Sequence, residues 1–232
     1  MEQFDNLTLL SEIKQASGPV GASYLSEVLS VPQATIGRRL KLMEEEGYLE
    51  KVDNKGRRLT VQGMSYYEEK VQLANKKVSI DKLFGLMENV TKKTLLEIIE
   101  VRRTLEGLTV ALACEKITDK QMSELDAIML AYAIEARYGG SGSELDLKFH
   151  LSIAEYSGNY TLYQILKILL MTDDVYVKFF SMAKALEKGQ ICVTQHDEIM
   201  QAIKERDPVK AKLAMERHLD KVTVDIEQYC NL

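Results

Sequence analysis

The sequence predicts a mainly α protein of two domains: a small N-terminal domain with one β-hairpin, then a larger antiparallel bundle of helices. The chain has 232 residues, which exceeds one average domain. It contains only three prolines, and its apolar residues recur at helical spacing over long stretches. A single segment, residues 48–60, shows the pattern of two short strands around a turn. These three observations give the fold class.

Composition indicates the class of protein and its cellular location. Hydrophobic residues make up 46% and charged residues 28%, as in an ordinary globular chain. No apolar run approaches the roughly 20 residues that span a bilayer, and the first residues lack the pattern of a secretory signal. The cysteines, Cys114, Cys192 and Cys230, are odd in number and widely spaced, which argues against disulfides. We therefore expect a cytoplasmic protein with no membrane partner.

The first third of the chain predicts three helices, at about 7–16, 22–30 and 34–47. Gly18-Pro19 ends the first helix, and Pro32 separates the second from the third. The inward-facing residues of the second and third helices should be Leu25, Val28, Leu29, Ile36, Leu40 and Met43. The hairpin follows, with a turn at residues 53–56 whose residue types tolerate positive φ. Two short helices and a hairpin in this order predict a winged helix-turn-helix domain over residues 1–66.

Such a domain reads DNA through its second helix and touches the adjacent backbone with its wing. We expect a double-stranded DNA operator to be contacted by Gln33, Thr35, Arg38 and Arg39 of the helix and by Lys55, Arg57 and Arg58 of the hairpin. Basic and acidic residues balance over residues 1–77, so the net charge of −5 lies in the remainder. The alternative is that these basic side chains form only a solvated face.

The remaining sequence predicts a helical linker at 67–90 and an all-helical domain at 91–232. Residues 118–121 form a capping-box pattern at the start of one helix. Glycine-rich or polar breaks at 139–142 and 157–159 separate further helices. Asp207-Pro208 supplies an N-cap and a first-turn proline for the last helix. Short connections of this kind predict an antiparallel bundle.

All three histidines of the chain, His150, His196 and His218, lie in this second domain. Asp146 and His150 are spaced i, i+4 on one helix, so their side chains share a face. His196 and His218 lie equally far before and after Asp207, which places them at the same height on antiparallel helices. Imidazoles with a carboxylate are a common ligand set for a divalent transition metal. The spacing therefore suggests a metal site built from three helices.

The same residues have simpler interpretations. A single histidine on an apolar helix face is more often a core residue with a hydrogen-bond partner than a ligand. Residues 143–146 also match a capping box, which would explain Asp146 without a metal. Spacing by itself leaves the two interpretations evenly balanced.

A family resemblance adds to this interpretation. Residues 146–159, DLKFHLSIAEYSGN, resemble the D-x-x-x-H … S-G-N signature of FadR C-terminal-like (FCD) domains. Residues 196–219 are similar to the ending of that family, and residues 100–106, EVRRTLE, to its opening helix. FCD domains are the sensor domains of one branch of the GntR superfamily of transcriptional regulators. The N-terminal domain is only loosely similar to GntR winged helices, so its lineage is left open.

The resemblance implies a metal held by Asp146, His150, His196 and His218, with zinc as the expected ion and nickel or manganese as alternatives. It also implies a small, carboxylate-bearing effector, for which Arg102 or Arg103 is a candidate contact. For both arginines the alternative is an ion pair with Glu100 or Glu106. We expect a homodimer that binds a pseudo-palindromic operator and is not an enzyme. The alternatives are a metal-dependent hydrolase, a purely structural metal, and a regulator that senses the metal itself.

Overall fold

The computed structural model describes residues 5–88, 91–140, 142–170 and 189–229, and the side chains of 189–193 and 229 lie outside this description. The chain forms two compact units, Met1–Leu83 and Phe84–Leu232. The border between them falls inside the segment predicted as a helical linker. No described helix is long and apolar enough to cross a membrane.

The first unit contains α1 (Asn6–Gln15), α2 (Ala22–Leu29), α3 (Gln33–Glu45), the strands β1 (Leu49–Val52) and β2 (Gly56–Leu59), and most of α4 (Val61–Glu88). The strands form an antiparallel hairpin in which Leu49 pairs with Leu59. The apolar faces of the first three helices and β1 share one core, whose buried residues include Leu9, Leu10, Leu25, Ile36, Leu40, Met43 and Leu49. This arrangement is the predicted winged helix-turn-helix.

Two glycines permit close backbone contacts around the hairpin. Gly56 has φ +123°, and a Cβ atom there would lie 2.3 Å from the carbonyl oxygen of Val20. This proximity lets Val20 form an isolated antiparallel bridge with Arg57 beside β2. A Cβ atom at Gly63 would lie 1.9 Å from the carbonyl oxygen of Tyr48. The start of α4 can therefore pack directly against the chain that enters β1.

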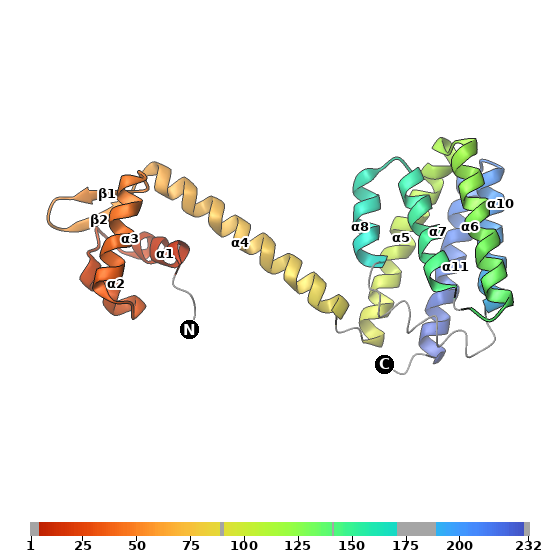
Figure 1. Ribbon diagram of the computed structural model, residues 1–232, viewed down its shortest axis with the longest axis horizontal. Helices are drawn as coiled ribbons and strands as arrows, with labels where there is room; N and C mark the ends of the chain where they lie inside the picture. Colours follow the sequence, from red (N-terminus) through yellow and green to blue (C-terminus); the bar gives the residue numbers. More distant parts are fainter. Residues whose placement is uncertain (1–4, 89–90, 141, 171–188, 230–232) are drawn as a thin grey trace. The chain divides into compact units, whose positions relative to one another are not determined.

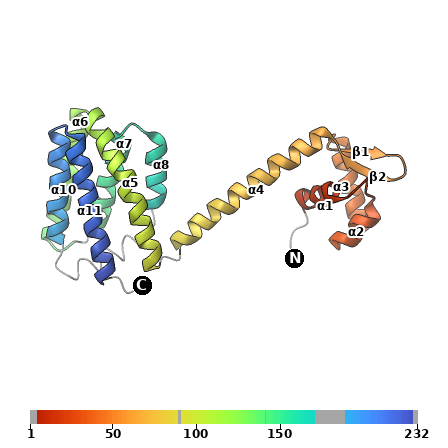
Figure 2. The ribbon, with the colours of Figure 1, turned by 180° about the vertical axis from the view of Figure 1, so that it is seen from behind.

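The described part of the second unit is helical (Figure 1). Its described helices are α5 (Lys92–Lys116), α6 (Asp119–Arg137), α7 (Ser143–Tyr156), α8 (Tyr160–Leu170), α10 (Gly189–Lys204) and α11 (Pro208–Tyr229). Helix α11 lies beside α5 and α10, α10 lies beside α6, and α7 packs on α5 and α6 (Figure 2). Helix α8 covers α7 and α5. The unit is the predicted all-α antiparallel bundle.

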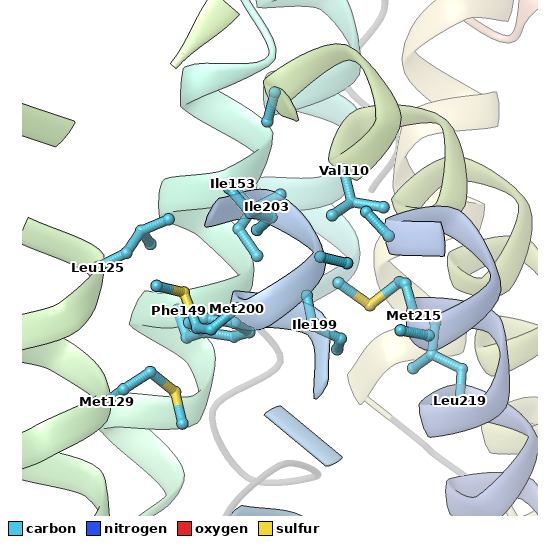
Figure 3. Close-up of a cluster of buried hydrophobic side chains, with 14 of the residues drawn as sticks. Val110, Leu125, Met129, Phe149, Ile153, Ile199, Met200, Ile203, Met215 and Leu219 are labelled. Atoms are coloured by element: carbon cyan, nitrogen blue, oxygen red, sulfur yellow. The ribbon is translucent and has the colours of Figure 1, made fainter. Parts of the chain in front are cut away.

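The core of the bundle is built from one apolar stripe on each of five helices (Figure 3). The labelled side chains Val110 of α5, Leu125 and Met129 of α6, Phe149 and Ile153 of α7, Ile199, Met200 and Ile203 of α10, and Met215 and Leu219 of α11 point toward one another. The Thr118 capping box begins α6 as predicted, and the Asp207 side chain accepts a hydrogen bond from the Lys210 amide at 2.9 Å. These caps fix where two helices of the bundle begin.

One sequence-based expectation about local structure was wrong, and one alternative interpretation is excluded. Val28 does not face inward: its side chain is 46% exposed, and Leu25 is the only fully buried residue of α2. Residues 143–146 do not form a capping box. Helix α7 instead begins after Gly142, which adopts a left-handed conformation with φ 67° and gives no side-chain cap. The side chain of Asp146 is therefore free of a capping role.

Candidate metal centre and nucleic-acid interface

The structure brings together the four residues that the sequence predicts as metal ligands. Asp146 and His150 come from α7, His196 from α10 and His218 from α11. One potential ligand atom from each lies within 4.8 Å of the others, and all four side chains are buried. These four residues are called the ligand cluster below.

The helix geometry predicted from spacing places these side chains. One turn of α7 separates Asp146 from His150, and the two residues project from the same buried face. The α10–α11 hairpin turns at Asp207, so His196 and His218 meet across it with ring centroids 4.6 Å apart. Phe149 lies 4.8 Å and Tyr132 lies 5.3 Å from the His196 ring, centroid to centroid. Aromatic rings thus form part of the wall of the cluster.

The hydrogen bonds of the cluster test whether it suits a cation. Among the described residues, Asp146 Oδ1, His150 Nε2 and both ring nitrogens of His196 have no hydrogen-bond partner. His196 Nε2 lies 3.2 Å from Asp146 Oδ1, yet the geometry does not make a hydrogen bond. Each buried polar atom without a partner costs about 1–3 kcal/mol. A transition-metal ion would satisfy these donors, since its preferred ligands are imidazole nitrogen and carboxylate oxygen.

The protonation states of the histidines favour the same interpretation. Burial, reinforced by the charge of His150, holds the pKa of His196 well below its usual range. Burial, followed by the charges of His196 and His150, does the same to the pKa of His218. Both imidazoles are therefore neutral near pH 7, which is the form that binds a metal. Burial also raises the pKa of the Asp146 carboxyl to about 6, against the opposing influence of His150 and Arg102.

A second layer of polar groups surrounds the cluster. His218 Nδ1 lies 3.1 Å from Oε1 of Gln195. His150 Nδ1 contacts Oε2 of Glu106, a carboxylate that is 1% exposed. Glu106 also accepts a hydrogen bond from Arg102 Nε at 2.6 Å. Although burial raises the pKa of Glu106, Arg102 and His150 outweigh it and lower that pKa to about 2.

From the sequence, Glu106 was predicted only as an ion-pair partner for an arginine, and its place beside the cluster was not predicted. A signal was present in the periodicity of α5. Arg102 and Glu106 fall on the same stripe as the buried residues Leu95, Ile99, Val110 and Ala113. Two charged residues on a buried stripe pair with each other or with something else buried. Here they do both.

The two arginines proposed as effector contacts lie in different environments. Arg102 is 4% exposed and bonded to Glu106, in contact with the second layer of the cluster. Arg103 lies on the outer side of α5, where it donates hydrogen bonds to both carboxylate oxygens of Asp220 at 2.6 and 3.2 Å. It also lies 3.7 Å from the Glu216 carboxylate. Only Arg102 is close to the ligand cluster.

The candidate DNA-contacting residues of α3 stand at the start of that helix. Gln33 and Arg38 are exposed and Thr35 is half-buried. Arg38 Nε lies 3.4 Å from the carbonyl oxygen of Ala34 within its own helix. Arg39 is turned toward α1, where it donates a hydrogen bond to Asn6 Oδ1 at 3.0 Å. Arg38 is therefore the more available of the two arginines.

The basic residues of the hairpin differ in the same way. Lys55 is exposed at the tip. Arg57 is bound to Glu44 of α3 at 2.7 Å, and Arg58 to Glu50 of β1 at 2.6 Å. The pair between Arg57 and Glu44 was not predicted from the sequence. It joins the hairpin to α3, so Arg57 has a structural partner inside the domain.

Comparison with known proteins identifies the family. A family model described as FCD domain matches residues 97–221. The chain belongs to the FCD domain family, and its relatives make it a DNA-binding transcriptional regulator. This confirms the resemblance on which the ligand set was predicted.

Several named regulators are similar to this chain. The HTH-type transcriptional regulator YcbG of Bacillus subtilis is 26% identical over 197 residues, 84% of this chain and 74% of that protein. LutR of the same organism is 29% identical over 136 residues, 56% of this chain and 61% of that protein. The repressor NanR of Cronobacter sakazakii is 30% identical over 128 residues, 53% of this chain and 47% of that protein. All three are transcriptional regulators, so the hydrolase alternative finds no support.

Solved structures share the fold at low sequence identity. Streptococcus agalactiae GntR superposes with a TM-score of 0.52 at 22% identity, covering 94% of this chain and 95% of that one. Escherichia coli McbR/YncC gives a TM-score of 0.54 at 17% identity, covering 97% and 99%. Both matches extend over the N-terminal and C-terminal parts. The fold of this chain, a winged helix followed by a helical domain, is therefore shared with these two solved proteins.

Proposed function

We propose that the FCD domain holds a divalent transition metal in the ligand cluster and senses a small carboxylate-bearing metabolite there, altering operator binding by the winged helix. Zinc is the expected ion, with nickel or manganese as alternatives. The observation that carries the proposal is the convergence of four buried ligand atoms within 4.8 Å, several without any hydrogen-bond partner among the described residues. Buried ligand atoms arranged in this way destabilise the folded protein unless a cation binds them.

A metal bound by one carboxylate and three imidazoles supplies a positive centre, and an anionic effector would bind it as a fifth or sixth ligand. Asp146, His150, His196 and His218 would hold it. The buried guanidinium of Arg102 adds a second positive charge near the cluster. A carboxylate effector is attracted by both charges, which is the reason for proposing that ligand class.

The coupling between effector binding and DNA binding begins at the helices that carry the ligands. Three helices, α7, α10 and α11, contribute to one centre, so an effector that binds there has different affinities for different arrangements of these helices. A homodimer would carry two winged helices, and their spacing must match two operator half-sites. A change in that spacing would then change operator affinity. Binding to an operator requires a cytoplasmic location.

The first experiment measures metal and effector together. Purified protein is stripped with a chelator, and zinc, nickel and manganese are titrated in turn by calorimetry. Melting temperature is then recorded with a panel of small carboxylates, with and without the metal. We expect one ion per chain, and a rise in melting temperature with a particular carboxylate only when metal is present. Failure of every ion to bind would refute the proposal.

DNA binding distinguishes the remaining alternatives. Operator fragments selected from random sequence are assayed with stripped protein, metal-loaded protein, and loaded protein with effector. Our proposal requires the effector to change the affinity of the loaded protein. A change caused by metal alone would identify a metal sensor. No change in any arm would leave the metal a purely structural role.

A further inference from the structure

We infer that Glu106 is the positioning residue of the ligand cluster, orienting His150 for metal binding and tying the same carboxylate to Arg102. The inference rests on the proposed function, because it concerns the ion that the cluster is proposed to hold. It adds a residue that is not itself one of the four ligands. It also predicts that a change at Glu106 alters metal affinity although Glu106 does not touch the ion.

The contacts of Glu106 divide its carboxylate between two partners. Oε1 accepts a hydrogen bond from Arg102 Nε at 2.6 Å, one turn earlier on α5. Oε2 contacts Nδ1 of His150 on α7. Glu106 is 1% exposed and Arg102 is 4% exposed, so water does not compete strongly for either contact. Helices α5 and α7 lie against each other, which keeps this geometry fixed.

The contact with His150 has a chemical consequence. A neutral imidazole carries its proton on one nitrogen, and a carboxylate beside Nδ1 holds the proton there. The lone pair is then on Nε2. That atom lies 3.9 Å from Asp146 Oδ1, whereas Nδ1 is the nitrogen in contact with the Glu106 carboxylate. Glu106 therefore presents the lone pair of His150 toward the other members of the cluster.

The contact with Arg102 provides a competing explanation for the role of Glu106. Glu106 could serve only to neutralise a buried guanidinium, in which case its contact with His150 would be incidental. A buried ion pair can often be replaced by apolar residues of similar size with little loss of stability, whereas removing one partner is strongly destabilising. The decisive variants therefore change both residues together.

The test compares two double variants. Arg102→Met/Glu106→Leu removes the charge pair and the acceptor for His150. Arg102→Met/Glu106→Gln removes the charges but keeps an amide oxygen that can accept from Nδ1. Zinc affinity is measured by competition with a chromophoric chelator. We expect the Leu variant to bind zinc about 10- to 100-fold more weakly than wild type, as for other outer-layer partners of metal-bound histidines. The Gln variant should recover most of that loss.

A spectroscopic measurement separates positioning from folding. The chain has only three histidines, so the ¹⁵N spectrum of its imidazoles in the metal-free protein is simple to assign. We expect His150 to carry its proton on Nδ1 in wild type and in the Gln variant, and to lose that preference in the Leu variant. Asp220→Asn is the matched control, because it removes a carboxylate that binds the neighbouring Arg103 at the surface. It should change neither the tautomer nor zinc affinity.

The outcomes distinguish this inference from the proposed function. If wild type binds zinc and the Leu variant binds it within about threefold, less than outer-layer partners usually contribute, Glu106 only neutralises Arg102 and the inference is wrong. An unchanged His150 tautomer in the Leu variant would overturn it equally. If wild type takes up no zinc, the proposed function fails first and the inference falls with it.

Discussion

The imidazole rings of His196 and His218 lie 4.6 Å apart, centroid to centroid, although they stand on two helices on either side of the turn at Asp207. The pair exists because α10 and α11 run antiparallel from that turn and place positions equally distant from it side by side. Both rings are neutral and buried, and together they provide half of the ligand cluster. The α10–α11 hairpin therefore places side by side two imidazoles that stand on different helices.

Replacement of one of these rings should abolish metal-dependent stabilisation. We expect His218→Asn to weaken zinc binding more than any change at Glu106, since it removes a ligand. With free zinc at 1,000 times its Kd, wild type gains about 4 kcal/mol of stability, and the variant should lose nearly all of that gain. Thermal unfolding with and without zinc measures it. Arg217→Gln, an exposed neighbour paired with Glu198, is the control and should keep the full zinc response.

DNA affinity should depend on Arg38 and Lys55 in different ways. Arg38→Ala should cost about 1–3 kcal/mol at a specific operator, because arginine commonly reads guanine from the major groove. Lys55→Ala should weaken binding to all sequences alike and reduce the slope of log affinity against log salt by about 1. Fluorescence anisotropy at several salt concentrations gives both quantities. An Arg38 variant with unchanged operator affinity would show that α3 is not the reading helix.

The Arg57 side chain makes a contrasting prediction. Because it is bound to Glu44 across the domain, Arg57→Ala should lower the stability of the winged helix as well as any contact with DNA. Its pair is partly buried, so we expect a modest loss of about 1 kcal/mol. Urea unfolding measures this loss. Arg58→Ala, which breaks an exposed pair with Glu50, should cost less.

The thiol of Cys114 should resist modification at ordinary pH. Burial, with a smaller contribution from Asp207, raises the pKa of this thiol to about 11. The reactive thiolate is therefore scarce until the pH passes that value. The side chains of Cys192 and Cys230 lie outside the described residues, so the test uses a Cys192→Ser/Cys230→Ser protein. Iodoacetamide at pH 8 should leave it unlabelled until urea is added; rapid labelling of the folded protein would contradict the prediction.

The close approach at Gly63 should not tolerate a side chain. Gly63→Ala places a Cβ atom 1.9 Å from the Tyr48 carbonyl oxygen, so the start of α4 must move away from the hairpin. We expect a loss of several kcal/mol from the first unit, in line with overpacking against a rigid backbone. Gly37→Ala is the control, because a Cβ there meets nothing within 4 Å and alanine favours the helix by about 1 kcal/mol. Circular dichroism during urea unfolding distinguishes the two.

Much of the architecture could be predicted because it follows from local chemistry. Helical periodicity predicted the bundle, the turn residues at 53–56 predicted the hairpin, and Thr118 and Asp207 predicted two helix starts. The i, i+4 step and the symmetry of one hairpin suggested the ligand cluster, and the resemblance to FCD domains implied its four members. Both relations depend on helix geometry alone.

Only the tertiary structure decided the contacts between elements whose spacing carries no such rule. It turned Asp146 toward the histidines instead of a helix cap, and it directed Arg39 to Asn6 and Arg57 to Glu44. It also brought Glu106 of α5 against His150 of α7. A sequence determines where a polar side chain stands on its own helix, but its partner depends on how that helix packs against another. This is why the ligands were predicted and the residue that orients one of them was not.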